Sequence, residues 1–202
     1  MSARIHRYIQ FAGQTEPEGI HLTLPLAVET VQVLQGWGDH AAYHAQFTYN
    51  GVPLKGHPGL DLLAPPGADI QAADHGRVIE ISNEPGGLGR YVKLDHRWGE
   101  SLYAQLGEIL VETGQIVTRG QSIARTETLR RTYPIHLHFA IRIHPYNRFD
   151  GWGGFSDPTP FLYAVEVLPV SDTGELDVTI QTAQSTAPLP PMVIETRNLR
   201  RP

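Results

Sequence analysis

Apolar and polar residues alternate over short runs along most of the chain, and glycine or proline separates one run from the next. Successive side chains of an extended strand point to opposite faces, so an alternating run predicts a β-strand. The spacing of three or four residues that marks an amphipathic helix is seldom sustained. The pattern therefore predicts a mostly β protein whose strands are joined by tight turns. The expected strands are residues 5–11, 20–24, 30–34, 77–82, 90–95, 108–112 and 137–143.

Two short helices are also expected. The first covers residues 39–46, and the second follows Asp157-Pro158 and continues through residues 161–165. Residues 83–89, which lie between two of the expected strands, are rich in glycine and contain a proline, so they predict a turn.

The chain divides into a central body at residues 37–165 with an extension on either side. Residues 1–36 are expected to form an N-terminal β extension. Residues 166–202 form a C-terminal extension in which residues 181–191 are polar and rich in proline, a composition typical of an extended linker. Residues 192–195 could add a strand, and the last residues form a basic tail.

Composition limits the classes of protein to consider. The 202 residues include 16 Lys and Arg against 21 Asp and Glu, and this net charge of −5 disfavours non-specific nucleic-acid binding, which needs a concentrated basic face. Apolar residues make up 41%, enough for a folded core. No apolar run approaches the roughly 20 residues that span a bilayer, so no membrane span is expected. The absence of cysteine excludes disulfides, thiolate metal sites and cysteine nucleophiles.

The first patterned histidine occurs in His57-Pro58-Gly59-Leu60-Asp61. Pro58-Gly59 excludes a helix, so we expect a turn that runs into a strand at residues 61–63. Such a turn can bring the imidazole and the carboxylate to one point. A surface histidine followed by a turn aspartate is the alternative interpretation.

His136 and His138 are separated by one residue within an expected strand, so both imidazoles project from the same face. Ordinary strand histidines are again the alternative. Barrels of the cupin type also use such a pair, but they need a glutamate a few residues later, where residues 139–142 of this chain read FAIR. This excludes the cupin interpretation.

The two patterns together contain a donor set that zinc accepts. One histidine, one aspartate and one further histidine leave a fourth position for water, as in a catalytic zinc site. A second histidine beside the last ligand can then act as a base or as a transition-state donor.

Five blocks of the sequence carry a resemblance to a known family. They are HPGLD, AADHGRVIEIS, GRYVKLDHRWGESLYAQL, VETGQIVTRGQSIA and HLHFAIR. In order and spacing, over about residues 36–162, they resemble the lysostaphin/LytM-type zinc endopeptidases. The resemblance implies a mostly antiparallel β-sheet or sandwich of the duplicated-hybrid-motif type with few short helices. It also implies a zinc-dependent endopeptidase that acts on peptidoglycan cross-bridges or stem peptides.

Carried over to the matching positions, the resemblance makes His57, Asp61 and His138 the ligands of one Zn²⁺ per chain. It makes His136 a catalytic histidine that activates water or stabilises an oxyanion. Residues 111–121 resemble the hairpin of the family and are interpreted as scaffold. Lipoyl- and biotin-carrier domains have similar hairpins, but no lysine lies at a modification turn here, which argues against a carrier role.

One position departs from the family pattern. The family reads Tyr-x-His-Leu in its middle strand and uses that histidine in catalysis, whereas this chain reads Tyr103-Ala104-Gln105-Leu106. Gln105 can hold a water or a substrate carbonyl by hydrogen bonds, but it cannot take up a proton near neutral pH. The sequence thus leaves two functions open: a zinc metallopeptidase whose activity Gln105 reduces, and a LytM-like binding or regulatory module with little or no turnover.

Three further histidines have weaker patterns. His96 matches a histidine often found at this place in the family, and it is either a substitute base or a buried structural residue. His40 and His44 share a possible helical face and could line the rim of a cleft.

The resemblance implies an extracytoplasmic location, although the first 19 residues contain no uninterrupted apolar stretch and do not read as a secretory leader.

Overall fold

The structure of the chain is a computed structural model that describes residues 4–6, 19–28, 30–129, 133–162, 165–167 and 178–181. The strand expected at residues 192–195, residues 182–191 of the proline-rich segment and the basic tail lie outside these residues. Residues 7–11 of the first expected strand do so as well, while residues 4–6 form a strand.

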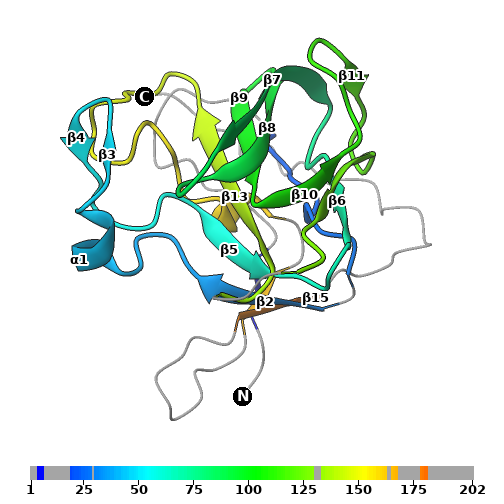
Figure 1. The fold of residues 1–202 in the computed structure, drawn as a ribbon, viewed down its shortest axis with the longest axis horizontal. Coiled ribbons are helices and arrows are strands. Elements are labelled where there is room, and N and C mark those ends of the chain that lie inside the picture. Colours follow the sequence, from blue (N-terminus) through cyan, green and yellow to red (C-terminus); the bar gives the residue numbers. More distant parts are fainter. Residues whose placement is uncertain are drawn as a thin grey trace, which may run out of the picture.

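An antiparallel sheet of ten strands is the main element of the fold (Figure 1). Its neighbours pair in sequence order only in part, so segments far apart in the chain lie side by side. Across the sheet the strands are β1 (Arg4–His6), β14 (Val165–Val167), β15 (Val178–Gln181), β2 (Thr30–Gln35), β5 (Leu60–Leu63), β13 (His136–Ile143), β9 (Gly99–Ala104), β8 (Gly89–His96), β7 (Gly76–Glu84) and β11 (Ile116–Val117).

Smaller elements flank this sheet. A three-stranded sheet consists of β10 (Leu106–Ile109), β12 (Ser122–Thr126) and β6 (Asp69–Gln71). Helix α1 (Ala41–His44) is followed by a hairpin of β3 (Thr48–Tyr49) and β4 (Val52–Pro53). Figure 1 shows α1 and this hairpin at one side of the molecule, with β6 and β10 at the other.

The main apolar core combines residues of the two larger sheets. Ile70, Leu106 and Ile123 come from the three-stranded sheet, and Val92 and Phe139 come from the ten-stranded sheet. All five are at most 1% exposed. Burial of each contributes roughly 1.5–3 kcal/mol, so packing between these sheets holds the fold together.

Strand β13 has one face in the core and an opposite face that carries His136 and His138, here called the functional face. Leu137, Phe139 and Ile141 belong to the main core. Because side chains alternate along a strand, His136 and His138 project from the opposite face of the same strand. A local constraint of strand geometry therefore places both histidines together, away from the core.

Most of the sequence expectations for the fold are confirmed. The mostly antiparallel β architecture is present, and β2, β7, β8 and β13 cover the strands expected at residues 30–34, 77–82, 90–95 and 137–143. The turn between β7 and β8 occupies residues 85–88. Residues 61–63 lie in β5, directly after the Pro-Gly turn.

Two of the expected strands are corrected by the structure. Residues 20–24 make only an isolated bridge, because the backbone N–H of Leu22 bonds to Phe161 and that of Thr23 bonds to Ala73, so no single partner strand is followed. The strand expected at residues 108–112 is β10, which ends at Ile109. It ends early because a turn at residues 112–115 is closed by the Gln115 N–H on the Glu112 carbonyl.

Both expected helices are shorter in the structure than predicted. Only Ala41–His44 of residues 39–46 is α-helical. The helix expected after Asp157-Pro158 is present only as a single 3₁₀ turn at Thr159–Phe161, and Leu162 already has extended backbone angles. Residues 163 and 164 lie outside the described residues. Strand β14 then begins at Val165.

Strand β9 was missed from the sequence because both of its faces are covered. Five of its six residues are buried, so the alternation of apolar and polar residues that marks a half-exposed strand is lost. The short strands β6 and β12 were not expected either, whereas β11 lies within the hairpin expected at residues 111–121.

Parts of both predicted extensions join the main sheet. β2 belongs to the segment assigned to the N-terminal extension. β14 begins at the last residue of the assigned body and ends in the C-terminal extension, and β15 lies within that extension. β15 pairs with β2, which in turn pairs with β5. The division at residues 36 and 165 remains a prediction. Among the described residues, no helix has the length and apolar character needed to cross a bilayer.

Candidate metal centre

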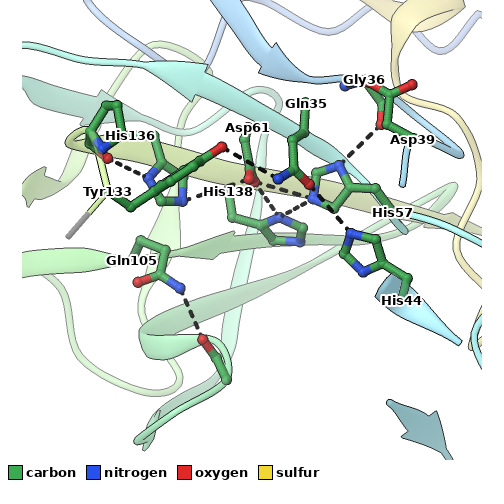
Figure 2. A network of polar contacts seen from close by, with 12 residues as sticks. Gln35, Gly36, Asp39, His44, His57, Asp61, Gln105, Tyr133, His136 and His138 are labelled. Atoms are coloured by element: carbon green, nitrogen blue, oxygen red, sulfur yellow. Dashed lines mark hydrogen bonds and ion pairs between the residues drawn. The ribbon is translucent and has the colours of Figure 1, made fainter. Parts of the chain in front are cut away.

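Three side chains that can bind a metal converge on the functional face of β13. His57 lies in the loop that leads into β5, Asp61 is in β5, and His138 is in β13. The antiparallel pairing of β5 with β13 sets Asp61 directly opposite His138. His57 precedes the Pro58-Gly59 turn, and Figure 2 shows its ring beside Asp61 and His138.

The ligand atoms of these three residues are in mutual contact. His138 Nδ1 is 2.8 Å from Asp61 Oδ1 and 3.1 Å from His57 Nε2, and His57 Nε2 is 3.2 Å from Asp61 Oδ1. All three residues are at most 7% exposed. Donors around a tetrahedral zinc ion are roughly 3.3 Å apart, so a small widening would accommodate such an ion. Within the described residues this is the cluster of histidine and acidic side chains that could hold a metal.

A backbone contact orients the His57 ring. His57 Nδ1 is 3.1 Å from the carbonyl oxygen of Gly36. A carbonyl only accepts, so Nδ1 donates and Nε2 presents its lone pair to the cluster. Such an outer contact fixes the tautomer and ring orientation that a metal ligand needs. Asp39 supports the same loop by accepting a hydrogen bond from the Gly36 N–H at 2.6 Å.

Glycine permits the close packing around the cluster. A Cβ at Gly59 would lie 2.6 Å from the Phe139 carbonyl oxygen and 2.9 Å from His138 Cε1. A Cβ at Gly56 would lie 2.5 Å from the Gly38 carbonyl oxygen. The HPGLD segment therefore needs glycine at position 59 so that β5 and the His138 ring can approach each other.

The electrostatics favour an ionised aspartate in the cluster. Burial alone would raise the pKa of Asp61, but hydrogen bonds and charge from His138 and His57 outweigh it and hold that pKa well below its usual range. Asp61 therefore stays a carboxylate at neutral pH. This is the form in which an aspartate binds a metal cation.

His136 lies beside the cluster with a defined tautomer. Its Nδ1 is 2.8 Å from the Pro134 carbonyl oxygen, so Nδ1 donates and Nε2 carries the lone pair. That Nε2 is 3.8 Å from Asp61 Oδ2. The second ring nitrogen is thus directed toward the cluster, as that of a general base would need to be.

Gln105 is held by the neighbouring turn. Strand β9 ends at Ala104, and Gln105 follows with a left-handed backbone at φ 64°. Its side-chain NH₂ donates to the Gly87 carbonyl at 2.9 Å. Figure 2 shows the amide directed to that carbonyl, away from the three-residue cluster. The expectation that Gln105 contacts a water or a substrate remains a prediction.

A second group of side chains borders the cluster, and the sequence had singled out only His44 among them. The His44 Nε2–H donates to Gln35 Oε1 at 3.3 Å, and Gln35 Nε2 donates to the Tyr133 hydroxyl at 3.4 Å. The His44 ring is 5.1 Å from that of His57. Burial and then the nearby His57 lower the pKa of His44 to about 4, so His44 is neutral at pH 7.

No local signal could have identified Gln35 or Tyr133. Gln35 reaches the site because β2 pairs with β5 and sets Gln35 opposite Asp61. Tyr133 precedes the β13 histidines, and its ring packs edge-to-face on His136 with centroids 5.0 Å apart.

The other histidines are now placed. His96 is buried, with Nδ1 2.7 Å from the His75 carbonyl and Nε2 2.7 Å from Ser101 Oγ, and it stacks on Trp98. It lies on the core side of β8 and acts as a structural residue of the core. His40 is exposed and precedes α1 with a left-handed backbone. His44 alone of the pair at positions 40 and 44 contacts the site.

Three known proteins are similar to this chain in sequence or in fold. An uncharacterised metalloprotease of Haemophilus influenzae is 34% identical over 67 residues, which are 33% of this chain and 14% of that protein. The catalytic domain of lysostaphin from Staphylococcus simulans, an antimicrobial peptidase, matches with a TM-score of 0.51 and 23% identity over 64% of this chain and 90% of that one. A zinc-containing peptidase from Vibrio cholerae matches with a TM-score of 0.50 and 27% identity over 68% of this chain and 38% of that one.

The fold is thus that of the lysostaphin-type peptidases, and the cluster is one that could hold a metal. Residues 55–150 match the sequence model of the family described as Peptidase family M23. Over this range, which is just under half of the 202 residues, the chain is similar to peptidase family M23, a class of peptide hydrolases. The matched range includes all three residues of the cluster together with His136 and Gln105.

Proposed function

We propose that the chain is a zinc-dependent endopeptidase whose substrates are peptide bonds of peptidoglycan cross-bridges or stem peptides. His57, Asp61 and His138 bind one Zn²⁺ in this proposal. The observation that carries it is the convergence of His57 Nε2, Asp61 Oδ1 and His138 Nδ1 within 3.2 Å of one another. Two imidazoles and one carboxylate form a nitrogen and oxygen donor set suited to a catalytic zinc site.

Each residue of the site has a distinct task in this proposal. Zinc, when bound, polarises a peptide carbonyl and lowers the pKa of a coordinated water. The Gly36 carbonyl holds the His57 ring, and the β5–β13 pairing holds Asp61 against His138. His136 accepts a proton at Nε2 because its Nδ1–H is already held by the Pro134 carbonyl.

The peptidoglycan substrate class rests on likeness to lysostaphin, which is described as an antimicrobial peptidase. The present chain also spans only 14% of its metalloprotease relative, so the substrate is proposed for this domain and not transferred from that protein. Gln105 favours the second candidate, a binding or regulatory module, because its amide is occupied by the Gly87 carbonyl and cannot take up a proton.

Metal content tests the proposed ligands first. We expect about one zinc per full-length chain by inductively coupled plasma mass spectrometry, and its loss in Asp61→Ala and His138→Ala. His75→Ala is the matched control because His75 is exposed and lies outside the cluster. Unchanged zinc in both cluster variants would refute the proposed ligands.

Hydrolysis then tests the enzyme itself. Zinc-loaded protein is expected to release soluble fragments and new amino groups from purified peptidoglycan, and His136→Ala is expected to lower that rate by about 10²–10⁴-fold with zinc content unchanged. Stoichiometric zinc without any release of amino groups would favour the binding module instead.

A further inference from the structure

Tyr133 contributes a hydroxyl group to the functional face that neither the metal cluster nor His136 accounts for. Its ring lies edge-to-face on the His136 ring, with centroids 5.0 Å apart and planes at 88°. Figure 2 shows the hydroxyl pointing toward the Asp61 carboxylate and Gln35, on the same side as the cluster.

Gln35 fixes the place of this hydroxyl. Gln35 Nε2 donates to the Tyr133 oxygen at 3.4 Å, and Gln35 Oε1 accepts from His44 Nε2 at 3.3 Å. The backbone of Gln35 is itself held opposite Asp61 by the pairing of β2 with β5. Gln35 therefore links the Tyr133 phenol to β2, which pairs with the strand β5 that carries Asp61.

The chemistry of the site calls for a neutral donor near the cluster. When water adds to a peptide carbonyl, the carbonyl electron pair moves onto its oxygen, which becomes an oxyanion and needs hydrogen-bond donors. Gln105 donates its side-chain NH₂ to the Gly87 carbonyl, and His136 Nδ1 donates to the Pro134 carbonyl. A phenol, with an ordinary pKa near 10, keeps its proton at neutral pH and can donate to an anion.

We propose that the Tyr133 hydroxyl donates a hydrogen bond to the oxyanion formed from the scissile carbonyl, with Gln35 positioning it. This inference rests on the proposed peptidase function. Water adds to the carbonyl carbon and gives one proton to His136. On collapse the C–N bond breaks, the carbonyl re-forms, and His136 passes that proton to the leaving amine. Tyr133 keeps its proton throughout, and only its hydrogen bond strengthens as charge develops on the oxygen.

Tyr133→Phe tests the hydroxyl alone, because the ring that packs on His136 is retained. In peptidoglycan hydrolysis we expect kcat to fall by about 10²-fold with KM within a factor of two, as when one oxyanion donor is removed. Zinc content should not change. Tyr43→Phe is the matched control: Tyr43 is 56% exposed on α1, and its activity should equal that of the unmodified chain.

A binding measurement with inorganic phosphate gives a readout that is independent of turnover. Phosphate is a tetrahedral oxyanion, and its affinity for the zinc-loaded chain should fall about ten-fold in Tyr133→Phe, because a hydrogen bond to a charged group is lost. Gln35→Ala, which keeps the hydroxyl but removes its support, should give a smaller loss of phosphate affinity and of kcat.

The outcomes separate this proposal from the function on which it rests. Equal phosphate affinity and equal kcat in Tyr133→Phe, in a chain that cleaves peptidoglycan, would overturn the role of Tyr133 alone. If the unmodified chain binds zinc and cleaves nothing, the proposed peptidase fails. A ten-fold weaker phosphate affinity in Tyr133→Phe would then still support the hydroxyl as the anion donor of the site.

Discussion

Asp61 and His138 face each other across the paired strands β5 and β13, and Asp61 Oδ1 is 2.8 Å from His138 Nδ1. The two residues are 77 positions apart in the chain, so only the antiparallel register makes them neighbours. A slip of one residue would turn one of them to the core face. The register of β5 on β13 is therefore as essential to the cluster as the identity of its side chains.

Gly59 should be intolerant of any side chain. In Gly59→Ala the new Cβ would lie 2.6 Å from the Phe139 carbonyl oxygen and 2.9 Å from His138 Cε1, so β5 and β13 would have to separate. We expect a loss of about 2 kcal/mol in the free energy of unfolding and at least ten-fold weaker zinc binding. Urea unfolding and a competitive zinc titration measure the two effects.

Gly86→Ala is the control for Gly59→Ala. Gly86 has a positive φ of 83° and no atom near its missing Cβ, so its replacement costs backbone strain of about 1 kcal/mol without touching the cluster. Zinc affinity equal in the two alanine variants would contradict the steric argument.

Gln105→His should raise the rate of peptide hydrolysis. Histidine is among the residues that tolerate a left-handed backbone, so the φ of 64° at this position is compatible with the change. The imidazole adds a group that titrates near neutral pH, and such a group contributes on the order of 10²–10⁴-fold. We expect at least a ten-fold higher kcat on peptidoglycan, and Gln105→Asn, which adds no base, should show no gain. A lower rate in Gln105→His would mean that the glutamine belongs to an adapted mechanism.

Asp74 should make stability depend on acidic pH. Burial raises its pKa, but hydrogen bonds from Arg119, Trp98 and the His75 N–H outweigh burial and lower it. A carboxyl whose pKa is lower in the folded than in the unfolded state stabilises the fold above its ordinary pKa of about 4, and this contribution disappears as pH falls through the folded value.

The comparison of the unmodified chain with Asp74→Asn by urea unfolding measures this contribution. The difference in unfolding free energy should be constant between pH 7 and about pH 5 and should shrink at lower pH. A difference that persists unchanged to pH 3 would show that Asp74 does not titrate in this range.

Arg142 should be required for the stability of the loop that contains Gly153 and Phe155. It is 1% exposed, donates to Glu100 at 3.0 Å, to the Gly153 carbonyl at 3.0 Å and to the Tyr49 hydroxyl, and lies over the Phe155 ring at 4.0 Å. Arg142→Met leaves the half-buried Glu100 carboxylate without this guanidinium, which should lower the free energy of unfolding by about 3–5 kcal/mol.

A second variant distinguishes lost charge pairing from lost packing at Arg142. Glu100→Gln combined with Arg142→Met removes both charges and should recover part of the stability. Trp152, which stacks on Trp37 with centroids 4.5 Å apart, should report the freed loop as a change in tryptophan fluorescence. Identical stability in the single and double variants would assign the whole effect to packing.

Local pattern alone was sufficient for part of the fold and of the site. The alternation in β13 placed His136 and His138 on one face, because the two-residue period of a strand is a property of neighbouring residues. Pro58-Gly59 predicted the turn that precedes β5 in the same way. Where alternation disappears, as in the buried strand β9, the prediction failed because both faces of the strand are covered.

Only the tertiary structure decided which distant residues share the site. The order of strands sets Gln35 opposite Asp61, and Asp61 opposite His138, through hydrogen-bonded pairing between segments that the sequence does not relate. Likewise, the left-handed backbone at Gln105 and the Gly87 carbonyl determine where its amide points. The sequence by itself determined the donor types, two imidazoles and a carboxylate, since these are properties of the residues. Their distances, tautomers and pKa values depend on long-range packing, and only the folded chain supplies it.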